Sequence, residues 1–351
     1  MRTTRLLVFI IIITIVATTA IGCEKTNNKE SLTRTEFLMD TVITLKIFDK
    51  QDKKILDQAI NRLKEIETRM SATIDTSDIS LINKNAGIEP VKVNEDVYNV
   101  IERAKYFAEI TNGAYEPTIG PLVELWNITG DNKEERKSLP EESQILEKKT
   151  LVDYHDLELM DDGFVFLNRK GMKLDLGGIV KGYAADEVKR IFIENGVNSA
   201  IIDLGGNVYA LGEKKSGEPW RIGVQNPFDV TGSYIGIINI KDKSIVTSGD
   251  YERFFIYQGE KYHHIIDAKI GYPSENEVAG ISVISEKSID GDALSTALFV
   301  LGVEEGTKLI NQLEGVDAIF ITKKDEVIIQ EKLIDIFELK NKDLNLMINS
   351  N

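Results

Sequence analysis

The chain has 351 residues, of which 42% are hydrophobic and 28% are charged, a composition typical of a soluble globular protein with a substantial core. Its formal net charge of -15 excludes a general nucleic-acid binder, because no broad basic surface is available to match a polyphosphate. A small anionic ligand would therefore be neutralised locally, by a metal ion, by backbone amides or by a few chosen cations.

The N-terminal segment indicates the compartment. Arg2 and Arg5 precede an apolar stretch over residues 6–17, which is typical of a secretory signal peptide. We expect this signal to cover residues 1–22 and to end in the lipidation motif Ala20-Ile21-Gly22-Cys23.

Cys23 is the only cysteine of the chain, so it has no internal disulfide partner and is better explained by acyl chains on a processed N-terminus. Leucine is more usual than Ala20 in such motifs, which leaves an uncleaved transmembrane anchor as the alternative. Either reading places the rest of the chain at the extracytoplasmic face of the cell membrane, after a flexible spacer over residues 23–33.

The length after the spacer is enough for one large domain or two closely packed ones, and we expect this folded part to cover residues 34–335. The predicted helices cover residues 53–70, 97–111, a stretch after Pro140, a segment ending near Asn195-Gly196, 292–302 and 304–313. The predicted strands cover residues 41–48, 157–160, 164–167, 200–203, 221–225, 236–240, 245–248, 254–257, 262–266, 281–285 and 318–322. Hairpins across Asp161-Asp162-Gly163 and across residues 258–261 argue against a purely parallel sheet. We predict an α+β fold with mixed and antiparallel sheets flanked by helices, followed by a polar tail over residues 336–351.

A glycine-rich segment from Asp175 to Asp186 joins a strand-like run to a helix. Gly177 and Gly178 lack the Cβ atoms that would block a ligand, the start of the helix offers unpaired N–H groups, and Lys181 adds a positive charge. These features indicate a nucleotide or pyrophosphate ligand, although neither the P-loop nor the Rossmann spacing is present. The alternative is a tight strand-to-helix turn without a ligand.

The sequence Asp-Leu-Gly-Gly occurs twice, at residues 175–178 and again at residues 203–206. This repeat raises the hypothesis that the domain consists of two related halves.

A second chemical motif covers residues 290–297. On a helix, Asp292 and Thr296 stand one turn apart on the same face, so that a carboxylate and a hydroxyl point at one hard cation. Mg²⁺ suits this pair because it takes few protein oxygens and leaves room for phosphate oxygens and water. The alternative is a helix cap, in which Asp290 or Asp292 satisfies the first amides.

The third motif contains His263 and His264 on a predicted strand, where successive side chains point to opposite faces. Only one of the two histidines therefore faces a given site. It would position a phosphate or move a proton near neutral pH, because the ordinary histidine pKa is about 6.5. A hydrogen-bonded structural pair is the alternative.

Together these motifs resemble the flavin transferase family known as ApbE. The resemblance runs from about Phe37 to Thr322, and the ordered presence of its motifs is highly specific. The matching segments are Leu38-Met39-Asp40-Thr41, Ala114 to Leu122, Asp175 to Asp186, Thr247 to Arg253, His264 to Pro273 and Asp292 to Ala297.

The resemblance implies an Mg²⁺-dependent enzyme that splits FAD, releases AMP and attaches FMN to a threonine or serine of a partner protein. The implied acceptors are subunits of membrane redox complexes or extracytoplasmic electron-transfer proteins. The implied metal ligands are Asp292, Thr296 and a main-chain carbonyl near Val180. The implied catalytic residues are His264 and Asp292, and the implied FAD-binding residues are Met39, Gly177, Gly178, Lys181, Ser248, Gly249, Asp250, Glu252 and His264.

Some residues depart from the family pattern. Ala268 and Ile270 replace a common proline and threonine after the histidine motif, which predicts altered turn stability more than lost activity. Glu116 stands where aspartate is common. Without the resemblance, Met39 would be read as a core residue.

Two rival functions remain open at this point. An FAD pyrophosphatase would release free FMN and AMP, because water would replace the protein hydroxyl. A lipoprotein that only binds flavin would release no AMP.

Overall fold

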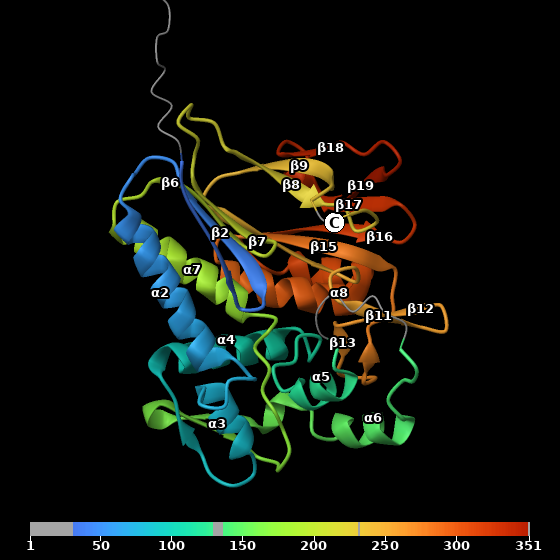
Figure 1. Cartoon of the computed structure of the whole chain (residues 1–351). Coiled ribbons are helices and arrows are strands. Elements are labelled where there is room, and N and C mark those ends of the chain that lie inside the picture. Colours follow the sequence, from blue (N-terminus) through green and yellow to red (C-terminus); the bar gives the residue numbers. More distant parts are fainter. Residues whose placement is uncertain (1–30, 129–135, 231, 350–351) are drawn as a thin grey trace, which may run out of the picture. The chain divides into compact units, whose positions relative to one another are not determined.

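The computed structural model describes residues 31–128, 136–230 and 232–349 (Figure 1). The predicted signal peptide, Cys23 and most of the predicted spacer lie outside these residues. Within the described ranges, no helix has the length and apolar character that crossing a membrane requires.

A nine-stranded sheet forms the centre of the domain (Figure 1), in the order β1-β2-β6-β7-β10-β15-β16-β17-β19. All neighbouring strands are antiparallel except β17 and β19, which run parallel. The mixed sheet confirms the predicted α+β class. The strands are β1 (Leu32–Leu38), β2 (Thr41–Ile47), β6 (Ser199–Leu204), β7 (Asn207–Gly212), β10 (Lys243–Gly249), β15 (Val278–Ser285), β16 (Val316–Thr322), β17 (Glu326–Gln330) and β19 (Asn345–Asn349).

Both faces of this sheet are buried, because successive residues of a strand point to opposite sides. On β16, Phe320 packs into the core under the helices α2 (Lys53–Met70), α7 (Val180–Glu194) and α8 (Ser288–Ile310). The neighbouring Ile319 packs into a second core with Trp220 and Ile238. That core lies under a small sheet of β8 (Trp220–Gln225), β9 (Tyr234–Ile240) and β18 (Phe337–Leu339).

The remaining elements surround one end of these layers (Figure 1). The helices are α3 (Asp78–Lys84), α4 (Glu95–Ile110), α5 (Gly120–Trp126) and α6 (Glu142–Lys149), with short 3₁₀ turns at Tyr154–Asp156, Asp161–Gly163 and Glu331–Leu333. A three-stranded sheet contains β3 (Val91–Lys92), β5 (Phe164–Leu167) and β4 (Leu157–Met160). Two hairpins pair β11 (Phe254–Tyr257) with β12 (Glu260–His263), and β13 (Ile266–Asp267) with β14 (Tyr272–Pro273).

The structure corrects the predicted ends of the domain. Strand β1 begins at Leu32, inside the predicted spacer. The predicted polar tail is wrong over its described part, because β18 pairs with β9 and β19 pairs with β17. These strands form through main-chain pairing with strands that are distant in the sequence, so local patterns do not reveal them.

The second hairpin and the repeat also differ from the predictions. The turn of the hairpin is Gln258-Gly259, so Glu260 and Lys261 belong to β12 and the predicted four-residue loop is wrong. In the repeat, residues 175–178 lead into a helix, whereas Gly205 and Gly206 form the tight turn between β6 and β7. The two copies thus have different local structures and give no support to related halves.

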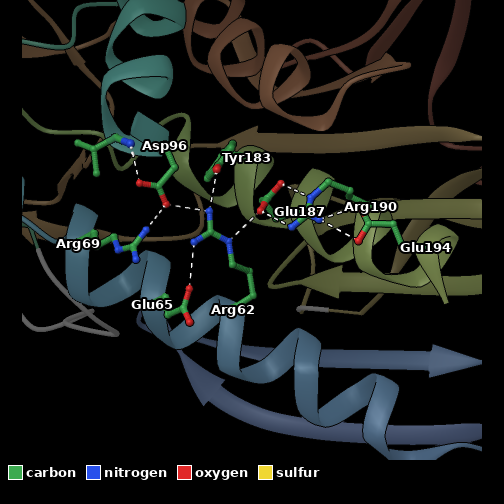
Figure 2. Close-up of polar contacts among 9 residues, drawn as sticks. Arg62, Glu65, Arg69, Asp96, Tyr183, Glu187, Arg190 and Glu194 are labelled. Atoms are coloured by element: carbon green, nitrogen blue, oxygen red, sulfur yellow. Dashed lines mark hydrogen bonds and ion pairs between the residues drawn. The ribbon is translucent and has the colours of Figure 1, made fainter. Parts of the chain in front are cut away.

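A charged network holds α2 against α4 and α7 (Figure 2). The Arg62 side chain, 14% exposed, donates from Nε to Glu187 at 2.8 Å and from Nη2 to Asp96 at 2.8 Å and to the Tyr183 hydroxyl at 2.9 Å. Arg69 also donates to Asp96, at 2.8 Å. Because Tyr183 lies in the first turns of α7, this network fixes α2 relative to the glycine-rich segment.

Replacing Arg62 with alanine should lower the free energy of unfolding by about 3 kcal/mol, because two largely buried carboxylates lose a partner. Urea unfolding measures this change. The matched control is Arg190→Ala, since Arg190 is 48% exposed and also pairs with Glu187. We expect that variant to lose less than about 1 kcal/mol, and equal losses from both variants would contradict the buried network.

Candidate functional site

A cavity of about 410 Å³ lies where the β1–β2 turn, the start of α7, the first half of α8 and the hairpin segment after β12 meet. Its walls bring together all but two of the residues predicted for the site, although these lie far apart in the sequence. The predicted residues on its wall are Met39, Gly177, Gly178, Val180, Lys181, Ser248, Glu252, His264, Asp292 and Thr296.

Gly249 and Asp250 are the two predicted binding residues that do not line this cavity. Asp250 is 3% exposed, and its carboxylate pairs with Lys261 at 2.7 Å. A Cβ on Gly249 would lie 2.1 Å from the ring of Tyr251, so this glycine is required by side-chain packing. The structure thus gives both residues packing or ion-pair contacts beside the cavity wall, and their role in FAD binding stays a prediction.

The start of α7 differs from the predicted cradle of unpaired amides. The N–H groups of Ile179 and Val180 donate to the carbonyl of Leu176, at 3.0 and 2.9 Å. The N–H of Gly182 donates to Oδ2 of Asp292 at 2.8 Å, and the N–H of Lys181 also bonds this carboxylate.

Asp292 therefore occupies the anion site that the N-terminus of α7 offers, and it caps this neighbouring helix and not its own. In the segment from Gly177 to Gly182, all of which the structure describes, only the N–H of Gly178 lacks an acceptor. The predicted amide cradle is reduced to this one group, and the Lys181 side chain has to supply positive charge directly.

The other predicted cap, Asp290, has a different partner. Its two carboxylate oxygens accept from Nε and Nη2 of Arg103, both at 2.8 Å. Asp290 is thus held away from the cavity by a bidentate ion pair, which leaves Asp292 as the carboxylate of this motif on the cavity wall.

Charges of both signs meet in the cavity. Burial raises the pKa of Asp292, while the charge of Lys181 opposes the rise. Burial likewise raises the pKa of Glu252, opposed by Lys181 and Arg253. Among the residues that the structure describes, Lys181 makes no ion pair within 4.0 Å, so its ammonium group remains available to an anionic ligand.

The residues beside Asp292 fit a hard cation such as Mg²⁺. The carboxylate of Asp292 binds two N–H groups and keeps further lone pairs, and the Thr296 hydroxyl has no hydrogen-bond partner in the described parts of the chain. A Cβ on Gly178 would lie 3.1 Å from the Thr296 hydroxyl oxygen, so only glycine leaves space beside it. No cluster of three or more His, Cys, Asp or Glu suited to a metal occurs within residues 31–128, 136–230 and 232–349. A site here would thus use oxygen ligands of mixed type, which suits Mg²⁺.

His264 faces the cavity in a defined tautomer. Its ring Nδ1 lies 3.3 Å from the carbonyl oxygen of Arg253, which only accepts, so Nδ1 carries the proton and Nε2 keeps its lone pair. Burial lowers the pKa of His264 to about 3, helped by the charge of Arg253. His264 is therefore a neutral base at physiological pH.

His263 points the other way and is buried. Its Nε2 bonds the carbonyl of Ser274 at 2.8 Å, and its ring meets Phe299 edge to face. The structure thus places one histidine at the cavity and the other in the core. The predicted strand over residues 262–266 is wrong at this point, because β12 ends at His263 and His264 lies just after it.

Met39 reaches the cavity from a strained turn between β1 and β2. Met39 and Asp40 both have positive φ angles, 54° and 57°, in a two-residue hairpin that normally prefers Asn-Gly. The left-handed conformation costs a residue such as methionine about 1–2 kcal/mol. The Met39 N–H donates to Oε1 of Glu67 on α2 at 2.7 Å, which holds the strained turn.

Replacing Glu67 with alanine should weaken FAD binding about tenfold, because the turn that carries Met39 loses a charge-assisted hydrogen bond. Quenching of flavin fluorescence measures the affinity. Glu67→Gln is the matched control, since its amide oxygen still accepts from Met39, and it should bind FAD almost as tightly as the original protein. Equal losses in both variants would show that the charge of Glu67 matters and the turn does not.

Several further wall residues were not predicted for the site, among them Glu67, Trp126 and Arg253. Arg253 is the last residue of the motif Thr247 to Arg253, and its place in that motif could have identified it as a site residue. Glu67 lies on the predicted helix, but its partner is set by tertiary packing. Trp126 stacks with Tyr262 and donates to the carbonyl of Gly271 at 2.8 Å, and no sequence pattern marks it.

Comparisons with known proteins find related sequences over most of the chain. Residues 39–320 match the model of the ApbE family. The chain is 38% identical over 293 residues to the FAD:protein FMN transferase of Klebsiella pneumoniae, covering 83% of this chain and 89% of the relative. It is 34% identical over 320 residues to that of Treponema pallidum, covering 86% of this chain and 87% of the relative.

The fold is also found in a solved structure. The ApbE protein from Thermotoga maritima superimposes with a TM-score of 0.76 at 32% identity, covering 84% of this chain and 95% of that protein. The match extends over the elements that build the cavity, from Met39 on the β1–β2 turn to Thr296 on α8. This chain is a member of the ApbE family.

Proposed function

We propose that this protein transfers the FMN moiety of FAD to a threonine or serine hydroxyl of a partner protein, with Mg²⁺ as cofactor, and releases AMP. The observation that carries the proposal is the single cavity in which Lys181, Asp292, Thr296 and His264 meet. Relatives that are 34% and 38% identical and named FAD:protein FMN transferase support it.

The reaction joins the acceptor oxygen to the phosphorus of the FMN half and breaks the bond from that phosphorus to the bridging oxygen. The bridging oxygen leaves with AMP. The proton of the acceptor hydroxyl goes to Nε2 of His264, whose lone pair is left free by the bond from Nδ1 to the Arg253 carbonyl.

The other cavity residues position and neutralise the diphosphate. Lys181 provides a mobile cation next to the Gly178 amide, the one N–H of the turn without an acceptor in the described chain. Asp292 and Thr296, with the Val180 carbonyl nearby, would hold the cation. Mg²⁺ bound there would neutralise charge on the leaving phosphate.

The test is a reaction of the purified protein with FAD, Mg²⁺ and a candidate acceptor, followed by intact-mass spectrometry of the acceptor and chromatography of the nucleotides. The proposal expects an FMN adduct and one AMP for each adduct. AMP with free FMN and an unmodified acceptor would indicate an FAD pyrophosphatase. Bound FAD without AMP would indicate a flavin-binding protein.

For the location, we propose a lipid anchor on Cys23 at the extracytoplasmic face of the membrane, with the acceptor exposed on the same side. The motif around Cys23 and its status as the only cysteine support this placement. Cell fractionation tests it, because Cys23→Ala should move the protein from the membrane fraction to the soluble fraction. An unchanged distribution would favour an uncleaved anchor.

A further inference from the structure

Tyr115 occupies the cavity wall between α4 and α5, next to the proposed cation site. It is 3% exposed, and its backbone N–H donates to the Thr111 hydroxyl at 3.1 Å, which fixes its position. A Cβ on Gly178 would lie 3.2 Å from Cε2 of Tyr115 and 3.1 Å from the Thr296 hydroxyl oxygen. The ring edge beside the Tyr115 hydroxyl therefore adjoins the space next to Gly178.

The Tyr115 hydroxyl is buried and has no hydrogen-bond partner among the residues that the structure describes. Its nearest acidic neighbours, Asp292, Asp175 and Glu116, are bonded to other groups. Asp292 accepts from Gly182, Asp175 accepts from Gly177, and Glu116 accepts from Thr118 and Tyr154.

An unpartnered buried hydroxyl is costly, and native proteins rarely keep one without a reason. Burial, with the three carboxylates, raises the pKa of Tyr115 well above its ordinary value, so the hydroxyl keeps its proton and is a donor. The group is thus poised for an acceptor that a ligand brings into the cavity.

We propose that the Tyr115 hydroxyl donates a hydrogen bond to a non-bridging oxygen of the FAD diphosphate. This inference rests on the proposed function, because it takes FAD as the ligand of the cavity. The diphosphate is the part of FAD that needs donors beside Lys181, and the Gly178 N–H and the Tyr115 hydroxyl are two donors on this wall without an acceptor in the described chain. Tyr115 thereby becomes a binding residue for the phosphates and not a packing residue.

Tyr115→Phe tests this role, since it removes one oxygen and keeps the ring. We expect FAD and ADP to bind about ten- to a hundredfold more weakly, because the variant loses a hydrogen bond to a charged phosphate oxygen. Riboflavin, which has no phosphate, should bind as before. Unfolding of the ligand-free protein should need the same or a higher urea concentration, because an unsatisfied buried group is lost. A merely structural hydroxyl would give a less stable protein and equal losses for riboflavin and FAD.

The matched control is Tyr209→Phe, because Tyr209 is also 3% exposed but lies on β7 away from the cavity. It should leave FAD, ADP and riboflavin affinities unchanged. Unchanged FAD and ADP affinity in Tyr115→Phe would overturn the proposal. A loss seen with Mg²⁺ and absent without it would also overturn it, since the hydroxyl would then bond a metal-bound water.

The outcome is separable from that of the proposed function. An original protein that binds FAD and ADP but releases no AMP would refute the transfer reaction, while the loss of ADP affinity in Tyr115→Phe would still support the phosphate contact.

Discussion

Replacing Asp292 with asparagine should reduce turnover at least about a thousandfold and leave the fold intact. The asparagine oxygen still accepts the N–H of Gly182, which Asp292 binds at 2.8 Å, so the cap of α7 survives. The neutral amide loses the charge that would hold Mg²⁺. Initial rates of AMP release over a range of Mg²⁺ concentrations measure the effect, with urea unfolding as the check on the fold.

Asp290→Asn is the matched control for this experiment. Asp290 lies on the same helix, but it is paired with Arg103 and does not line the cavity. Its variant should keep the rate and lose a modest amount of stability. If the Asp292→Asn protein kept the full Mg²⁺-dependent rate, Asp292 would be excluded as a ligand of the cation.

The second large effect is expected for His264→Gln. Loss of a positioned general base typically costs a factor of about 10²–10⁴ in rate. The affinity for FAD should change little, because the imidazole is assigned to the acceptor proton. Steady-state kinetics with saturating acceptor, together with FAD titration, separate the two quantities, and a variant with normal kcat would exclude this role.

The pH dependence gives an independent check on His264. Its pKa in the folded protein is lowered from 6.5 to about 3, so it stays neutral throughout the range in which the enzyme would work. The rate should therefore show no inflection near pH 6.5 that depends on His264. The stability associated with the neutral ring is present above pH 6.5 and is lost as the pH falls toward 3. Acidification should thus cost the original protein more stability than it costs His264→Gln.

Much of the secondary structure could be predicted because it follows from local patterns. The amphipathic repeat of α2 predicts both ends of this helix, Lys53 and Met70. The turn residues between β4 and β5 predict the two strands of their hairpin. Gly302, with a φ of 75°, separates two helical segments, as the sequence indicates. The edge strand β19 was not predicted because it forms by pairing in parallel with β17, and its own sequence has no clear strand pattern.

The sequence predicts which residues line the cavity better than it predicts the hydrogen bonds that these residues make. The motif positions that line the cavity follow from the ApbE resemblance, but the amides of α7 were wrongly assigned to a ligand. The N–H of Gly182 binds Asp292, which lies 110 residues later in the chain. No local sequence pattern indicates that this carboxylate takes the place of a ligand at the start of α7. The free hydroxyl of Tyr115 is similarly a product of tertiary packing, which buries it without a hydrogen-bond partner in the described chain.

The central claim is that the diphosphate of FAD lies between Lys181 and a cation held by Asp292 and Thr296. Crystals of the His264→Gln protein soaked with FAD and Mn²⁺ would test it most directly, because anomalous scattering locates the metal. We predict a metal peak beside Asp292 and Thr296 with the phosphates next to Lys181. A dinucleotide bound with its phosphates outside this cavity, or a metal far from Asp292, would contradict the account.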